Sequence, residues 1–203
     1  MILGFAWLFP IAYLLWIQPN LYDGGRHFLF VVPPMVCLAA LSVEWLCRLF
    51  EQRGAIRLRN LILLLASFSV IPTALSMWRL HPYQYLYFNT VSGGLPDAYM
   101  RDETDYWGLS HKEAAEWLNE YVEQIDPEGT RVYKVHQRYT RWMLQEFLNP
   151  DRFEMWKPRE GADFYVSVTR FNLHVVYPEA SLLHVVQREG VPLCLIYALP
   201  EEP

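Results

Sequence analysis

The sequence predicts a membrane α-helical segment of three transmembrane helices, followed by a small extracytoplasmic α/β domain. Three apolar stretches are each close to the length that crosses about 30 Å of hydrocarbon, and they cover about 1–17, 28–46 and 61–78. Residues 1–78 carry three acidic and five basic side chains, whereas 79–203 carry 19 acidic and 12 basic ones. From residue 110 onward, patterns typical of helices and of strands alternate. The predicted parts are a transmembrane region at 1–78, an aromatic junction at 79–109 and an extracytoplasmic α/β domain at 110–203.

The first two predicted spans flank a polar loop at Gln18–His27. Pro10 lies inside the first span, where a transmembrane helix tolerates proline because neighbouring helices can satisfy the freed backbone group. Pro33 and Pro34 stand near the start of the second span, where missing N–H donors cost least. Both stretches are therefore compatible with transmembrane helices.

The short loop between the second and third spans predicts the orientation. It holds one acid, Glu51, against four basic residues: Arg48, Arg53, Arg57 and Arg59. Because cytoplasmic loops of membrane proteins are enriched in Lys and Arg, this loop is predicted to be cytoplasmic. The loop at 18–27 and the C-terminal domain then lie outside. We expect an integral protein of the cytoplasmic membrane, with the lipid bilayer as a partner and an extracytoplasmic domain in the cell envelope.

The junction from Trp78 to Ser110 is rich in amphipathic rings, which collect at the level of the lipid headgroups. These rings belong to Trp78, Tyr83, Tyr85, Tyr87, Tyr99, Tyr106 and Trp107. Gly93, Gly94 and Gly108 favour a shaped loop over a regular helix. We therefore expect a structured junction that can form one wall of a site.

A capped helix is predicted to open the α/β domain. Ser110 and Glu113 have the spacing of a capping box. Apolar residues then recur at helical spacing, namely Ala114, Trp117, Leu118, Tyr121, Val122 and Ile125. The predicted turn Asp126–Gly129 ends this helix.

The rest of the chain is predicted to contain one further helix and several strands. The helix is expected at Arg138–Leu148, and strands at Thr130–Val135, Phe153–Trp156 and Asp163–Thr169. Leu182–Gln187 and Pro192–Ala198 flank a predicted hairpin with Gly190 in its turn. Helices between strands, with an antiparallel pair at the end, indicate a small α/β layer.

Composition and motifs disfavour several function classes. An acidic C-terminal part without a basic stripe argues against nucleic acid as a partner. The three cysteines, Cys37, Cys47 and Cys194, lack the spacing of a metal site, and structural disulfides are not expected. The sequence has no nucleophile elbow, CxxC or HExxH motif, and its histidines are scattered. A soluble hydrolase or metalloenzyme therefore has no support.

The loop before the second span is the first candidate binding site. It contains Asp23, two glycines, Arg26 and His27. A guanidinium pairs with a phosphate through two parallel hydrogen bonds, and neighbouring glycines let backbone N–H groups approach the same anion. An anchor for lipid headgroups at the start of a helix explains the same residues equally well. A substrate phosphate and a lipid headgroup are both open as ligands.

The second candidate site combines the carboxylates Asp102, Glu103 and Asp105 with the rings of Tyr106 and Trp107. Such carboxylates can bind a divalent cation, exchange a proton or hydrogen-bond sugar hydroxyls, and the rings can stack on a pyranose face. In the structural alternative, Asp102 and Glu103 are solvated and Asp105 caps the turn before the next helix. His81, in the aromatic junction, is a third candidate as a proton carrier.

A family resemblance rests on four segments in order. They are Tyr22–Phe30 (YDGGRHFLF) with Pro33, His81–Asn89 (HPYQYLYFN), Gly93-Gly94 and Glu103–Ser110 (ETDYWGLS). Over roughly 20–110, the chain resembles the C-terminal part of bacterial membrane glycosyltransferases of the GT-C superfamily. These enzymes are related to the dolichyl-phosphate-mannose–protein mannosyltransferases, glycosyltransferase family 39.

The resemblance implies a polyprenyl-phosphate sugar as donor, an outward-facing site and transfer with inversion. It makes Arg26 and His27 the residues expected to bind the donor phosphate. The residues expected to contact the sugar or the acceptor are Asp23, His81, Asp105, Tyr106 and Trp107. In this superfamily the catalytic carboxylate lies in the first outer loop of a much longer chain, to which no loop here corresponds. No metal site is predicted, and a divalent cation stays open as a cofactor.

The leading hypothesis is a C-terminal portion of an inverting glycosyltransferase that uses a lipid-linked sugar. A start inside an apolar helix is typical of a fragment, completed by a missing N-terminal portion. A split enzyme completed by a separate subunit is a variant of this hypothesis. The alternative from a different class is a non-catalytic, membrane-anchored module that binds a glycan or a protein.

Overall fold

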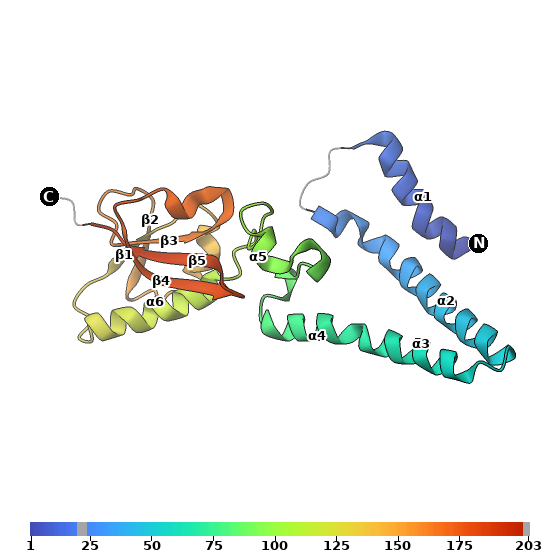
Figure 1. Cartoon of the computed structure of the whole chain (residues 1–203). Coiled ribbons are helices and arrows are strands. Elements are labelled where there is room, and N and C mark those ends of the chain that lie inside the picture. The colour runs from blue at the N-terminus through green and yellow to red at the C-terminus, as the bar shows by residue number, and fades with distance from the viewer. Residues whose placement is uncertain (20–23, 201–203) are drawn as a thin grey trace. The chain divides into compact units, whose positions relative to one another are not determined.

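A computed structural model describes residues 1–19 and 24–200. The chain forms two compact units, Met1–Pro72 and Thr73–Pro203, and each is described by itself. The described residues of the first form helices, and the second contains a mixed α/β domain (Figure 1). The expected fold class is confirmed at this level: an N-terminal helical region followed by a small α/β domain with a five-stranded sheet.

The helical unit consists of three packed helical runs. Its elements are α1 (Ile2–Ile17), the 3₁₀-helix η1 (Gly24–Val31), α2 (Val32–Gln52) and α3 (Ile56–Phe68), with α4 (Val70–Arg79) crossing the boundary between the units. α1 packs against α2, and α2 packs against α3. Because η1 continues directly into α2, the loop predicted at Gln18–His27 is shorter than expected at its C-terminal end.

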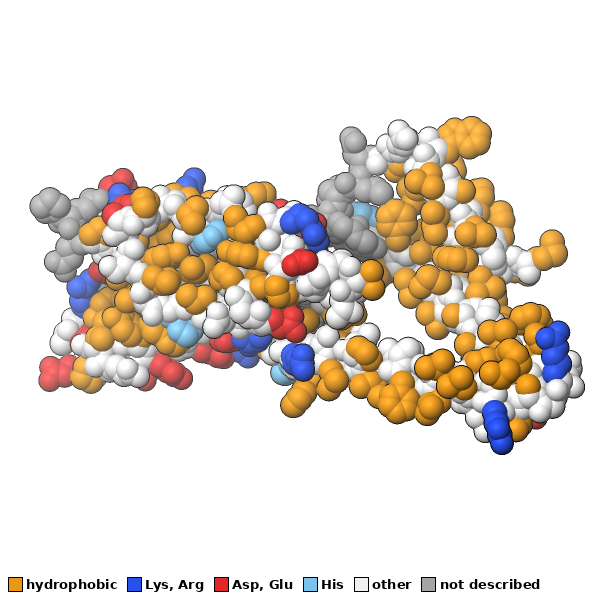
Figure 2. Space-filling view, viewed as in Figure 1, with side chains coloured by type: hydrophobic (Ala, Val, Ile, Leu, Met, Phe, Trp, Pro, Cys, Tyr) orange, Lys and Arg blue, Asp and Glu red, His pale blue; other side chains and the backbone are white. Residues whose placement is uncertain are grey.

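Within the described residues, two helical runs are long and apolar enough to cross a membrane, His27–Gln52 and Ile56–Arg79, whereas Ile2–Ile17 is shorter. The second run is interrupted at Ser69, between α3 and α4. Pro72 explains this break, because it lacks an N–H and its ring crowds the carbonyl group four residues earlier, at Phe68. Hydrophobic side chains cover most of the visible face of these helices, and basic side chains gather at the turn between α2 and α3 (Figure 2).

The α/β domain is built on a sheet with strand order β2-β1-β3-β5-β4. Its strands are β1 (Tyr133–His136), β2 (Phe153–Trp156), β3 (Phe164–Val168), β4 (Ser181–Arg188) and β5 (Val191–Ala198). β1 pairs in parallel with β2 and β3, whereas β5 pairs antiparallel with β3 and β4. All five residues of β3 are buried, as expected for a central strand covered on both faces.

The terminal hairpin forms as predicted. Glu189 and Gly190 connect β4 to β5, and both have positive φ angles, of 51° and 77°. Two consecutive residues with positive φ angles produce the type I′ turn, whose twist matches that of antiparallel strands. The final antiparallel pair of the predicted α/β layer is therefore confirmed.

The first helix of the domain, α6 (His111–Ile125), lies against β5 and β4. Its buried residues recur at helical spacing, namely His111, Ala114, Ala115, Leu118 and Val122. The predicted capping box is wrong, because Ser110 Oγ donates to Asp105 and makes no cap hydrogen bond. Glu113 instead forms an ion pair with Arg188, whose Nη2 lies 2.7 Å from Glu113 Oε2.

Two predicted elements are shorter than expected because side chains hold their ends in other conformations. β1 begins at Tyr133 because the Asp126 carboxylate accepts hydrogen bonds from Thr130 N and Oγ1, both at 3.0 Å. The predicted helix at Arg138–Leu148 is reduced to α7 (Arg141–Gln145). Its N-cap, Thr140, has a left-handed backbone conformation.

The core of the domain extends into the predicted junction at 79–109. This segment contains η2 (Gln84–Leu86), η3 (Thr90–Ser92) and the short helix α5 (Gly94–Ala98). Its most buried apolar residues in the hydrophobic core are Leu80, Tyr83, Leu86 and Leu95. Tyr83 Oη also donates to Glu113 Oε2 at 2.8 Å. The junction is therefore an integral part of the packed domain.

Candidate functional site

Asp105 is a buried group that organises the start of α6. Its side chain is 2% exposed, and its oxygens accept hydrogen bonds from Leu109 N and Ser110 N, each at 3.0 Å. The hydroxyl groups of Tyr85 and Ser110 also donate to it. Burial, together with the charge of Asp105, raises the pKa of Tyr85, so this phenol remains a proton donor. The arrangement favours the capping role for Asp105 over contact with a ligand.

His111 is another fully buried polar residue in this region. Its Nδ1 lies 2.6 Å from the carbonyl oxygen of Gly108, and its Nε2 contacts Gln137 Nε2. A neutral imidazole with its proton on Nδ1 satisfies both contacts, since Nδ1 then donates and Nε2 accepts. Burial lowers the pKa of His111, although the charge of Asp105 and the Gly108 carbonyl oppose this shift. His111 therefore serves as a neutral hydrogen-bonding residue of the core.

Tyr106 and Trp107 lie next to one another, with their ring centroids 5.0 Å apart. The Arg170 guanidinium lies over the Tyr106 ring at 5.5 Å, and its Nη1 donates to the Tyr106 carbonyl oxygen at 3.4 Å. Tyr139 Oη donates to the same oxygen at 3.2 Å. The Trp107 ring is half exposed. This contact with Tyr139 also explains why the chain around 138–140 is held outside the predicted helix.

The other predicted site residues fall in different parts of the chain. His81 Nδ1 lies 2.8 Å from Gln84 Nε2, and its carbonyl oxygen accepts a hydrogen bond from Arg188. Asp23 lies outside the described residues. The backbone of Arg26 belongs to η1, but its side chain is outside what the structure describes, and His27 follows it in the same 3₁₀-helix.

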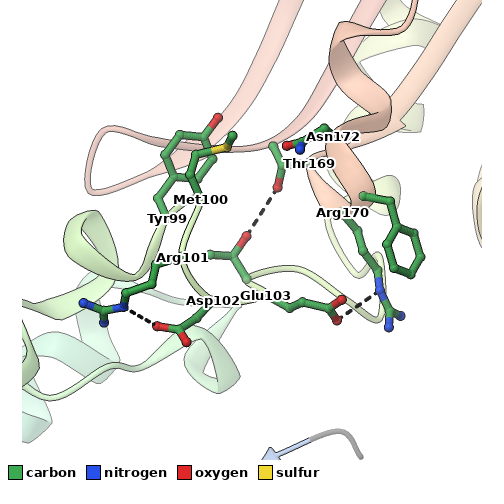
Figure 3. Close-up of a pocket in the computed structure, with 10 residues that line it drawn as sticks. Tyr99, Met100, Arg101, Asp102, Glu103, Thr169, Arg170 and Asn172 are labelled. Carbon is green, nitrogen blue, oxygen red and sulfur yellow. Dashed lines mark hydrogen bonds and ion pairs between the residues drawn. The ribbon is translucent and has the colours of Figure 1, made fainter.

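A pocket of about 180 Å³ lies where two distant segments of the α/β domain meet (Figure 3). One wall is formed by Tyr99–Thr104, and the other by Thr169–Asn172, which follows β3 and enters the 3₁₀-helix η4 (Arg170–Val175). Because β1, β2 and β3 are parallel, their carboxyl ends lie at one edge of the sheet. Ligands of α/β proteins commonly bind at this edge.

Polar contacts hold the two walls of this pocket together. Thr104 Oγ1 lies 3.3 Å from Thr169 Oγ1, and Arg170 Nε lies 3.0 Å from Glu103 Oε2. On the first wall, Arg101 Nε lies 2.9 Å from Asp102 Oδ2. The four charged side chains therefore form two ion pairs that cancel in net charge.

The sequence indicated only one wall of this site. The carboxylates of Asp102 and Glu103 were candidates, but Arg170, Phe171 and Asn172 carry no recognisable motif. The one feature that marks them is found in the backbone, where Phe171 and Asn172 have φ angles of 55°. Left-handed conformations of non-glycine residues are costly and cluster at functional sites.

A metal centre is not found in the part of the chain that the structure describes. No group of three or more His, Cys, Asp or Glu side chains there could hold a metal ion. In comparisons with known proteins, no family model, curated protein or solved structure matches the chain. The function is therefore inferred from the residues and their arrangement.

Proposed function

We propose that the chain is the C-terminal part of an inverting membrane glycosyltransferase. The enzyme transfers a sugar from a polyprenyl-phosphate donor to an extracytoplasmic acceptor. The observation that carries this proposal is the motif Gly24–His27 at the beginning of a helical run, His27–Gln52, that is long and apolar enough to cross a membrane. A phosphate attached to a membrane lipid is a ligand that such a position can reach.

Integration into a membrane is supported by how little of the apolar helices is buried. In the most apolar 18-residue stretch of Ile56–Arg79, no residue is buried. In the corresponding stretch of His27–Gln52, 11% of the residues are buried. The core helix of a soluble protein buries its apolar face against other elements. Side chains such as Leu64, Leu65 and Phe68 are more than half exposed, and lipid is the solvent in which this exposure is favourable.

The chemistry follows from the donor. A hydroxyl group of the acceptor attacks the anomeric carbon, and the bond between that carbon and the phosphate oxygen breaks with inversion. Arg26 stabilises the negative charge of the departing polyprenyl phosphate through charge-assisted hydrogen bonds. The family resemblance assigns the base that accepts the hydroxyl proton to a carboxylate in another outer loop of the enzyme.

A non-catalytic, membrane-anchored module is the second candidate function. It is favoured by the pocket at Tyr99–Thr104 and Thr169–Asn172, because this pocket lies wholly within the α/β domain and requires no other part of an enzyme. In that case the chain would bind a glycan or a protein without transferring a sugar.

Substitutions of Arg26 test the proposed function. Arg26→Ala in the full-length membrane enzyme is expected to weaken binding of a polyprenyl-phosphate sugar by about ten- to hundredfold. This range corresponds to the loss of about 1.5–3 kcal/mol from a charge-assisted hydrogen bond. Arg26→Lys should recover part of the loss, because an ammonium group cannot reproduce the bidentate fork. Binding is measured by titrating labelled donor into the enzyme in lipid nanodiscs.

Arg57→Ala is the matched control, because it removes the same charge from the loop predicted on the other side of the membrane. It should leave donor affinity unchanged. If Arg26→Ala folds normally and binds the donor as tightly as the wild type does, the phosphate role is wrong. Arg26 would then be a headgroup anchor.

A further inference from the structure

The pocket between Tyr99–Thr104 and Thr169–Asn172 has the size of a single sugar ring. Its volume is about 180 Å³, whereas pockets that enclose drug-sized ligands have about 300–1,000 Å³. An oligosaccharide would have to extend beyond it into solvent. The pocket can therefore enclose one residue of a glycan.

The charges of the pocket favour a neutral ligand. Asp102 and Glu103 are each paired with an arginine, at 2.9 and 3.0 Å, so the pocket has no net charge. A phosphate or a sugar acid would meet these two carboxylates without an excess of positive charge to compensate them. The pocket is therefore unsuited to the anionic part of a lipid-linked donor.

The same groups retain hydrogen-bonding capacity for hydroxyl groups. Within the described part of the chain, Arg101 uses only its Nε atom, which leaves its other guanidinium nitrogens as donors. Asp102 Oδ1 and Glu103 Oε1 accept no hydrogen bond from the described residues. The carboxamide of Asn172 likewise has no partner in the described part of the chain. A sugar hydroxyl both donates and accepts. It is therefore matched by the donors and acceptors that the two walls of the pocket present.

Apolar side chains line the pocket together with these polar groups. Phe171 is 65% exposed and Met100 is 62% exposed, although both are large hydrophobic residues. Met100 belongs to the wall Tyr99–Thr104 and Phe171 to the wall Thr169–Asn172. The backbone of each is left-handed, with φ angles of 65° and 55°. A pyranose ring presents an apolar C–H face as well as hydroxyl groups, and an exposed aromatic ring packs on such a face.

From the size, the neutrality and these exposed side chains, we propose that this pocket binds one neutral pyranose unit of the acceptor glycan. The inference rests on the proposed function, because the acceptor of that transfer is the glycan that the pocket holds. Phe171 packs on the ring, while Asn172, Asp102 and Arg101 hydrogen-bond its hydroxyl groups. The pocket thus positions an acceptor and takes no part in bond breaking.

Binding of simple glycosides to the full chain in lipid nanodiscs tests the proposal. The probes are methyl hexosides, methyl N-acetylhexosaminides and methyl hexuronides, and binding is followed by saturation-transfer NMR. A neutral glycoside is expected to bind in the millimolar range, and the hexuronides should not bind. Phe171→Ala and Asn172→Ala should each weaken the binding at least tenfold. Trp142→Ala should leave it unchanged, because Trp142 is exposed but does not line the pocket.

Thermal unfolding of each variant shows whether the domain is intact, and both substitutions are expected to leave it so because Phe171 and Asn172 are exposed. The proposal is overturned if no neutral glycoside binds, if the hexuronides bind better, or if both pocket variants bind like the wild type. Donor titration of the enzyme in nanodiscs separates the two proposals. If the donor binds normally and no neutral glycoside binds, this inference alone is contradicted. Glycoside binding without donor binding contradicts the transferase and leaves a binding module.

Discussion

Replacing Asp105 with alanine is expected to lower the free energy of unfolding of the α/β domain by about 3–5 kcal/mol. The carboxylate is 2% exposed and accepts hydrogen bonds from two backbone N–H groups and two hydroxyl groups. Its removal leaves several buried donors unsatisfied at the start of α6. Urea titration monitored by circular dichroism measures this loss of stability as a lower midpoint concentration of urea.

Asp102→Ala is the control for this prediction. Asp102 is about half exposed, and its ion pair is with the exposed Arg101, so its removal should cost less than about 1 kcal/mol. Asp105→Ala by itself separates the two roles that the sequence left open for Asp105. A variant that unfolds like the wild type but loses sugar transfer would make Asp105 a catalytic or binding residue and contradict the capping role.

A fragment that begins at residue 110 is expected to fail to fold, whereas a fragment that begins at residue 79 should unfold cooperatively. Leu80, Leu86 and Leu95 are at most 1% exposed and pack in the core of the domain. Each contributes about 1.5–3 kcal/mol by burial. Together they approach the total stability of about 5–15 kcal/mol that is typical of a domain. Circular dichroism and urea titration of both fragments measure the difference.

Single substitutions in the longer fragment provide the controls. Leu86→Ala should lower its free energy of unfolding by about 2–5 kcal/mol, because the side chain is fully buried. Leu109→Ala should have little effect, since Leu109 is 41% exposed. Equal midpoints for the fragments beginning at residues 79 and 110 would show that the junction is dispensable for folding.

Local patterns predicted those elements whose conformation is fixed by neighbouring residues. The strand at Phe153–Trp156 forms at the predicted positions, and the hairpin turn at Gly190 follows from turn chemistry. Elements set by distant side chains were predicted less well. Thr130 is held in a turn by Asp126, and Tyr139 is held by Tyr106, so a strand and a helix are shorter than their patterns suggest. Periodicity contains no information about such contacts.

The candidate site could be predicted only in part for the same reason. Asp102 and Glu103 are recognisable in the sequence as a cluster of carboxylates. Their partner wall begins at Thr169, 65 residues after Thr104, in a segment without any motif. Its position follows from the order of the strands, which brings the end of β3 to the junction. The neutrality of the pocket depends on the ion pair between Glu103 and Arg170, which cannot be inferred from either segment alone.

The central claim is that the α/β domain and its pocket lie on the outer side of a membrane. A reporter enzyme that is active only outside the cytoplasm tests it most directly. The reporter is fused after Pro203 in one variant and at Gly54, between α2 and α3, in the other. We expect activity from the fusion after Pro203 and none from the fusion at Gly54, because the arginine-rich loop is retained in the cytoplasm. Activity at Gly54 together with a silent fusion after Pro203 would contradict the orientation on which both site proposals depend.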